Sequence, residues 1–237
     1  MFRYTPARQS VSIALLGKFN PAIFSPDWLE RYDIIPGTSA QEGKVTVIHP
    51  EYSEIEVGPN IRFSIQPERF SIEFAEEPFV KALDAIILIF REILSHTPIT
   101  AIGVNYAIHF ALDSIDQRAQ LGRALAPVEP WGEWGQSLNN ENPAQIGGMI
   151  RVVMEETHPT DRQKGYRRVY IEPSVRSEYV DRLVGVYMAV NDHYEVDEAG
   201  DLGSSKAMEI LAEKFDSSIN KSKSIVASMM DYAGEMK

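Results

Sequence analysis

The stretch of residues 99–110, ITAIGVNYAIHF, constrains the fold more than any other part of the chain. It is an uninterrupted run of strand length, and successive side chains of a strand point to opposite faces of a sheet. One face carries the large apolar residues Ile102, Val104, Tyr106, Ile108 and Phe110. The other face carries only Ala101, Gly103, Asn105, Ala107 and His109. The sequence therefore predicts a central strand with one packed face and one face that another molecule can approach.

The part of the chain before this stretch has the pattern of a strand, a short helix, several strands and a long helix. Residues 10–19 alternate as a half-buried strand does, and Ser25 followed by Pro26 is typical of a helix start. Residues 44–75 read as short alternating strands separated by turns. Apolar residues then recur at helical spacing over residues 78–97, which predicts a long amphipathic helix.

The part that follows the central stretch repeats this order. Asp113 is placed to cap a helix that ends near Ala126, and residues 127–143 read as a loop-like insert rich in proline and tryptophan. Three strands and a closing helix follow, predicted over residues 145–156, 166–174, 181–195 and about 204–232.

The repeated order predicts an α+β protein built from two fused strand-helix-strands-helix units, residues 1–97 and 98–237. Such a unit cannot cover both faces of its own sheet, so two units side by side give one curved antiparallel sheet with helices packed on one face. We expect one compact structural domain. This order of elements resembles the tandem-repeat saddle of the TATA-binding-protein fold.

A second resemblance concerns residues 60–110. The run IRFSIQPERFSIEF, the helix around ILIFREIL and the strand TPITAIGVNYAIHF are similar to the middle of a scattered, uncharacterised bacterial family of about this length. The matching positions are Arg69 and Phe70, followed by Gly103, Asn105 and Tyr106. The family carries no established activity, and the resemblance implies a small bacterial or phage-borne accessory protein, of a defence or toxin-antitoxin type.

Composition limits the class of partner. The chain has 237 residues, of which 44% are hydrophobic, and its formal net charge is -11. This charge argues against nucleic acid, whose phosphates require a basic surface, and it favours a basic protein partner. The chain has no cysteine, which excludes a disulfide framework and a thiolate metal site. The absence of cysteine also fits a cytoplasmic protein, which we expect, and the strongest apolar run, residues 82–94, is too short to span a bilayer.

Candidate binding residues gather on the face of small residues. Asn105 and His109 lie on the central strand, Arg151 lies in a later strand, and Tyr187 and His193 lie in the last strand. The other histidines, His49, His96 and His158, lie close to prolines at the ends of elements and are expected at the surface. The strand arginines either pair with Glu73, Glu155 and Glu172 across strands, which we favour, or form an anion-binding groove.

Trp131 and Trp134, in the sequence WGEWG, are the remaining candidates for a partner contact. Aromatic anchors in loops often contribute to protein interfaces, but the two rings could equally plug the edge of the core. The apolar stripe of the closing helix leaves a similar choice, because this helix can cover its own sheet or pack on another subunit.

No catalytic, phosphate-binding or dinucleotide-binding motif is present, and no histidine pair has metal-ligand spacing. The sequence therefore predicts no catalytic residue, no cofactor and no metal. We expect a non-catalytic protein-binding or assembly module that forms homo-oligomers. The first alternative is an enzyme or a sensor of a small ligand or nucleotide, with a pocket around Asn105, His109, Arg151 and His193. The second alternative is a nucleic-acid binder.

Overall fold

The computed structural model of the chain describes residues 2–35, 44–49, 51–138, 147–158, 164–196 and 203–236, and it describes no side chains for residues 44–48. Apart from a short helix in the insert of residues 127–143, their main helices and strands follow the order predicted from the sequence.

The first half begins with a strand and a short helix whose start is set by local sequence. The Ser25 hydroxyl accepts the Trp28 N–H at 3.1 Å, and Pro26 occupies the first helical position, where its missing N–H has no consequence. The elements of this half are β1 (Arg8–Gly17), α1 (Pro26–Arg31), β2 (Lys44–His49), β3 (Tyr52–Val57), β4 (Ile61–Gln66), β5 (Arg69–Phe74) and α3 (Val80–Ile87). The helix α3 continues as a π-helical segment, Leu88–Ile93.

The second half starts with the stretch singled out in the sequence. It forms β6 (Ile99–Ala111), the longest of the described strands. The elements that follow are α4 (Ile115–Leu125), α5 (Gly132–Ser137), β7 (Val152–Thr157), β8 (Gly165–Pro173), β9 (Gly185–Glu195) and α6 (Ser205–Glu235).

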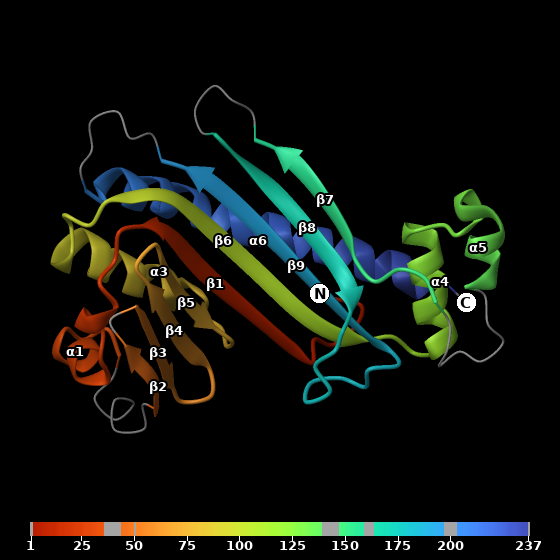
Figure 1. Cartoon of the computed structure of the whole chain (residues 1–237), viewed down its shortest axis with the longest axis horizontal. Helices are drawn as coiled ribbons and strands as arrows, with labels where there is room; N and C mark the ends of the chain where they lie inside the picture. Colours follow the sequence, from red (N-terminus) through yellow and green to blue (C-terminus); the bar gives the residue numbers. More distant parts are fainter. Residues whose placement is uncertain are drawn as a thin grey trace.

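The described strands form one antiparallel sheet of nine strands, in the order β2-β3-β4-β5-β1-β6-β9-β8-β7. The first strands of the two halves, β1 and β6, pair with each other in the middle, with Ser12 opposite Asn105 and Ala14 opposite Gly103. Each half continues outward from its own first strand (Figure 1). The predicted fold class is confirmed, because two strand-helix-strands-helix units are fused into a single sheet.

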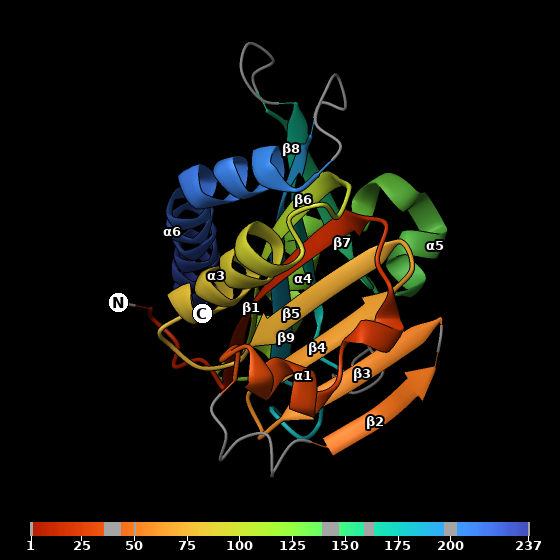
Figure 2. The same cartoon turned by 90° about the vertical axis from the view of Figure 1, so that its left-hand side faces the viewer.

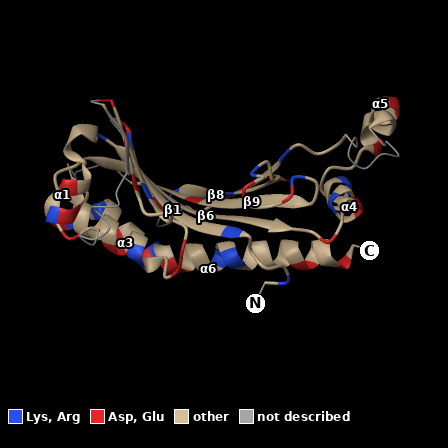
Figure 3. Ribbon diagram, turned by 90° about the horizontal axis from the view of Figure 1, so that it is seen from below, with Lys and Arg blue, Asp and Glu red and all other residues tan. Residues whose placement is uncertain are grey.

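The helices α3 and α6 pack on one face of this sheet, and no described helix covers the opposite side of the central strands (Figure 3). The apolar register of β6 faces these helices, so that Ile102, Tyr106 and Phe110 are fully buried. The Phe70 and Phe90 rings meet edge to face at 5.0 Å beneath the first half. The concave, helix-free side is called the open face below.

The closing helix α6 packs in cis. Its residues Leu211, Phe215, Val226 and Met230 are buried in the core of its own chain, and its principal contacts are with β6. Figure 2 shows it beside α3. Near its end, the helix is joined to the first residues of the chain, because the Arg3 guanidinium donates to the Gly234 carbonyl at 2.5 Å. The buried apolar stripe of this helix therefore packs against the sheet of its own chain.

Some element boundaries differ from the predicted ones. The helix cap before α4 is Ser114, whose hydroxyl accepts the Gln117 N–H at 3.1 Å, and not Asp113, which lies one residue earlier. The last strand begins at Gly185 and not at Asp181, because Asp181 accepts the N–H groups of Val184 and Gly185 in a tight turn.

The insert of residues 127–143 is not loop-like in its described part. A 3-10 turn, Glu129–Trp131, is followed directly by α5. Gly132 joins them with a φ of 60°, a conformation that glycine adopts readily. Similarly, the strand predicted from residue 145 starts only at Val152, and residues 145 and 146 lie outside the described part.

Candidate binding site on the open sheet face

The open face holds a broad hollow of about 570 Å³ whose floor consists of small side chains. Ser12 and Ala14 of β1, Gly103 and Ala107 of β6 and Ala189 of β9 line this floor. A Cβ atom added at Gly103 would lie 3.2 Å from the Asn191 amide nitrogen, so the centre of the floor is closely packed. Small residues at these positions keep the surface low between the taller side chains of the outer strands.

Two amides form a polar patch in the middle of this floor. The Asn191 side chain donates to the Asn105 side-chain oxygen at 2.5 Å, and Asn105 donates to the Ser12 carbonyl at 3.3 Å. These bonds hold three neighbouring strands in register and fix the direction of both amides. A ligand on the floor therefore meets oriented donors and acceptors rather than an apolar surface.

Aromatic side chains form one wall of the hollow. Tyr166 and Tyr170 of β8 stand beside Tyr187 of β9. The Tyr166 ring stacks on His193 at 4.6 Å, and the Arg168 guanidinium lies 4.2 Å from the centre of the same ring. The wall is thus built of rings held by stacking and cation–π contacts, which reduces the conformational freedom lost when a partner binds.

A second hollow of about 370 Å³ adjoins the first, and the two share Ser10, Glu73, Ala107, Glu172 and Tyr187. His109 lies in this second hollow, where its ring contacts those of Tyr179 and Tyr187 at 5.1 and 4.7 Å. Its Nδ1 lies 2.9 Å from the Ser174 hydroxyl, which is itself buried and so not available as a nucleophile. Together the two hollows form one continuous depression across β1, β6 and β9.

Burial controls the protonation of the groups in this depression. Desolvation, with smaller contributions from Arg176 and Arg8, lowers the pKa of His109. Desolvation likewise lowers the pKa of His193. Burial, then the nearby Glu172 carboxylate, raises the pKa of Tyr187. At neutral pH the site consequently presents neutral imidazoles and a protonated phenol, which bind by hydrogen bonding and stacking.

Most guanidinium groups on the open face are paired with carboxylates of the same face. Arg151 pairs with Glu172 and Arg168 with Glu155, each at 2.5 Å. Arg62 approaches Glu56 at 3.7 Å. The predicted cross-strand pairing therefore holds for Glu155 and Glu172. For Arg62 the register places Glu73 opposite, but the ion pair is made with Glu56 on the other neighbouring strand.

The structure brings most of the predicted site residues together. Asn105, Arg151, Tyr187 and His193 line the larger hollow, and His109 and Tyr187 line the smaller one. Trp134, within α5, and Trp131, at the end of the 3-10 turn before it, lie apart from these hollows at the far end of the molecule (Figure 1). Their rings meet edge to face at 5.6 Å and are 63% and 60% exposed, so they do not plug the edge of the core.

A buried charged cluster on the helix side was not anticipated. The Asp192 carboxylate is fully buried and lies 2.8 Å from the Arg167 guanidinium and 3.0 Å from His158 Nε2. The His158 ring also stacks on that of Tyr194. The expectation that His158 is a surface residue was wrong, because its side chain is only 12% exposed. The sequence held a signal: Asp192 falls in the apolar register of β9, between Val190 and Tyr194. Because this register faces the helices, the cluster takes no part in the open face.

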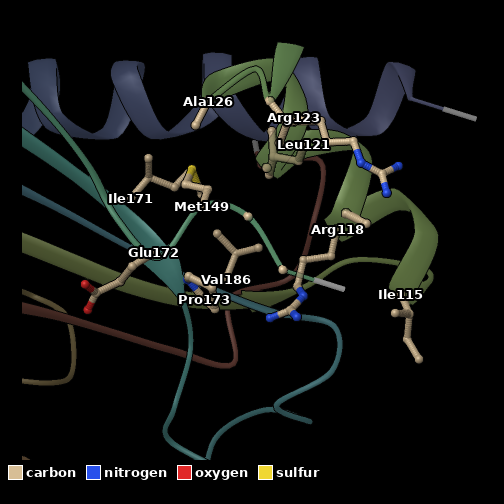
Figure 4. A pocket seen from close by; sticks show the side chains of 15 residues that line it. Ile115, Arg118, Leu121, Arg123, Ala126, Met149, Ile171, Glu172, Pro173 and Val186 are labelled. Carbon is tan, nitrogen blue, oxygen red and sulfur yellow. The ribbon is translucent and has the colours of Figure 1, made fainter. Parts of the chain in front are cut away.

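Another small hollow, of about 70 Å³, lies where α4 meets the ends of β8 and β9 (Figure 4). The apolar side chains of Leu121, Met149, Ile171 and Val186 line it, with Arg118 and Arg123 on the α4 side. None of the predicted site residues lines it. Gly147 also lines this hollow, where it lies against Leu138.

Comparisons with known proteins add no assignment: no protein-family model matches the chain, and no curated protein sequence matches it. Among the described residues, no group of three or more histidine, aspartate or glutamate side chains is placed to hold a metal ion. No described helix has both the length and the apolar character that crossing a bilayer requires. The class is therefore defined by fold and site alone, as an α+β protein with a concave open sheet.

Proposed function

We propose that this chain is a non-catalytic protein-binding module that takes a segment of a partner protein on the open face. The carrying observation is the continuous depression of two hollows, floored by small residues and walled by tyrosines. Protein interfaces are enriched in tyrosine, because this side chain supplies a large contact area and hydrogen bonding with little conformational cost.

The charges of the depression favour a polypeptide over a nucleic acid. Arg151 and Arg168 are already neutralised by Glu172 and Glu155, so the face presents alternating charges of both signs. A phosphate backbone requires a surplus of positive charge, whereas a protein segment can match a mixed pattern. The formal net charge of -11 points in the same direction and adds long-range attraction for a basic partner.

A floor-filling substitution tests this proposal. Ala107→Trp places a large ring where both hollows meet, and we expect it to abolish capture of the partner that the wild-type protein retains from its native host. Ser224→Trp, on the exposed side of α6, is the matched control and should retain the partner. Equal capture by all three proteins, with circular dichroism confirming that they fold alike, would show that the open face is not the binding surface.

A small polar ligand is the second candidate, because Asn105, Arg151 and His193 line the same hollow. The amide and the neutral imidazole would hydrogen-bond such a compound, and the terminal guanidinium N–H groups, which the Arg151–Glu172 pair does not use, would take its anionic or nucleotide-like part. A thermal-shift screen of nucleotides and small carboxylates tests this function. A ligand that raises the melting temperature of the wild type, but not that of His193→Ala or Asn105→Ala, would support it, and equal shifts in all three proteins would refute it.

A further inference from the structure

The strand β7 is the outermost strand on its side of the sheet, and it exposes apolar side chains on both of its faces. Val153 is 47% exposed and Met154 is 69% exposed, and Ile150 just before the strand is 84% exposed. Only β8 pairs with β7 among the described strands. A free edge with apolar side chains is a template for pairing with another strand.

The backbone groups that face outward from this edge can be identified. The His158 N–H donates to the Gly165 carbonyl on the β8 side at 3.0 Å. In an antiparallel pair, alternate residues exchange hydrogen bonds with the neighbour, so residues 152, 154, 156 and 158 turn their backbone groups toward β8. Arg151, Val153 and Glu155 consequently turn their N–H and C=O groups away from the sheet.

We propose that β7 pairs with β7 of a second copy of this chain, antiparallel and around a two-fold axis at Val153, so that the two sheets join into one. This inference does not rest on the proposed function. It rests on the match between the outward backbone groups, the side chains opposite one another and the charges that the sheet already carries.

The side chains favour this register over the two whose axis lies farther along the strand. With the axis at Val153, Arg151 lies opposite Glu155 of the second copy, and Val152 lies opposite Met154 of the second copy. An axis at Glu155 would place two identical carboxylates opposite each other. An axis at Met154 would place Val152 and Val153 opposite Glu156 and Glu155. Opposed like charges destabilise a sheet, and apolar residues gain nothing from opposed charges, so the axis at Val153 is favoured.

The joined sheet would extend the existing cross-strand rows. On the open face, Arg168 and Glu155 of one copy continue into Arg151 and Glu172 of the second, which gives a row of alternating sign. The Arg151–Glu172 ion pair uses Nε of Arg151, and the two terminal nitrogens of a guanidinium carry four further N–H groups for a second carboxylate.

The helix side of the joined edge would be apolar. Val169 lies opposite Met154, and Ile171 lies opposite Val152, within each copy. The junction therefore makes a row of Val169, Met154, Val152 and Ile171 that crosses from one copy to the other. This row would cover Met154, the most exposed apolar side chain of the strand.

The test is the mass in solution as a function of concentration, measured by light scattering and sedimentation. We expect the wild type to reach twice the monomer mass of 26.7 kDa. Val153→Pro should be monomeric, because it removes an outward N–H without breaking a bond to β8. Arg151→Glu and Glu155→Arg should each raise the dissociation constant at least about tenfold, because each places like charges opposite one another twice.

A mixture of the two charge variants separates pairing at this edge from a general loss of folding. Arg151→Glu gives a copy with two acids at these positions and Glu155→Arg gives a copy with two bases, so a mixture of equal amounts should form heterodimers. Circular dichroism should show each variant folded. A monomeric wild type at every concentration, a dimeric Val153→Pro variant, or a mixture that stays monomeric would each overturn the proposal.

Discussion

At the scale of single residues, His109 and His193 show how the open face responds to pH. Because burial lowers both pKa values, the unfolded chain binds more protons than the folded chain as the pH falls through the ordinary histidine range near 6.5. Protonation therefore favours unfolding, and stability is lost as the pH falls. Both side chains are only about half-buried, so the effect is moderate.

This gives the first prediction. Lowering the pH from about 7.5 to about 5.5 should reduce the melting temperature of the wild type more than that of the His109→Gln, His193→Gln double variant. Differential scanning calorimetry at both pH values measures the difference. His96→Gln, at an exposed position, is the control and should keep the wild-type dependence. A double variant as pH-sensitive as the wild type would contradict the prediction.

At the scale of elements, the start of α4 shows the limit of reading a cap from sequence. Asp113 and Ser114 are both good cap residues and stand next to each other. The structure uses Ser114, while the Gln117 side chain accepts the Asp113 N–H at 2.8 Å. Gln117 is buried and also donates to the Tyr4 hydroxyl at 2.9 Å, so a tertiary contact fixes which residue begins the helix.

The second prediction compares these two positions. Ser114→Ala should lower the free energy of unfolding by about 1 kcal/mol, because the Gln117 N–H loses its acceptor. Asp113→Ala should change it by less than about 0.5 kcal/mol, because its exposed side chain does not cap the helix. Urea denaturation measures both values. A larger loss of stability in Asp113→Ala than in Ser114→Ala would show that Asp113 is the cap.

At the scale of the whole molecule, the two halves are joined through their first strands and through the long last helix. The pairing of β1 with β6 runs from Arg8 opposite His109 to Gly17 opposite Ile99. Across the halves, Lys223 of α6 pairs with Glu77 at 2.7 Å, and the Ser204 hydroxyl donates to the Phe90 carbonyl beneath the sheet. Each half separated from the other would expose a central strand edge and an apolar face.

The third prediction follows from this shared core. Residues 1–97 and 98–237, produced separately, should each lack a cooperative thermal transition, and mixing them should restore one. Circular dichroism melting and the dispersion of amide resonances measure this. A cooperative transition in either half alone would show that the halves are separate domains.

The sequence by itself determined the order of the main elements, the class of the fold and the difference between the two faces of the central strand. These follow from local alternation and spacing, which residues such as Ile102, Gly103 and Val104 carry without reference to the rest of the chain. It also placed Asn105, Arg151, Tyr187 and His193 on one face, because strand parity alone assigns a face.

Only the tertiary structure decided which of these residues meet and which charges are neutralised. The pairing of β6 with β9 sets Asn105 beside Asn191, and the pairing of β8 with β9 sets Arg167 beside Asp192, where His158 also lies. Likewise, the position of β7 at the end of the sheet leaves Val153 and Met154 exposed. Strand order joins residues far apart in the chain, and local periodicity holds no information about which strands become neighbours.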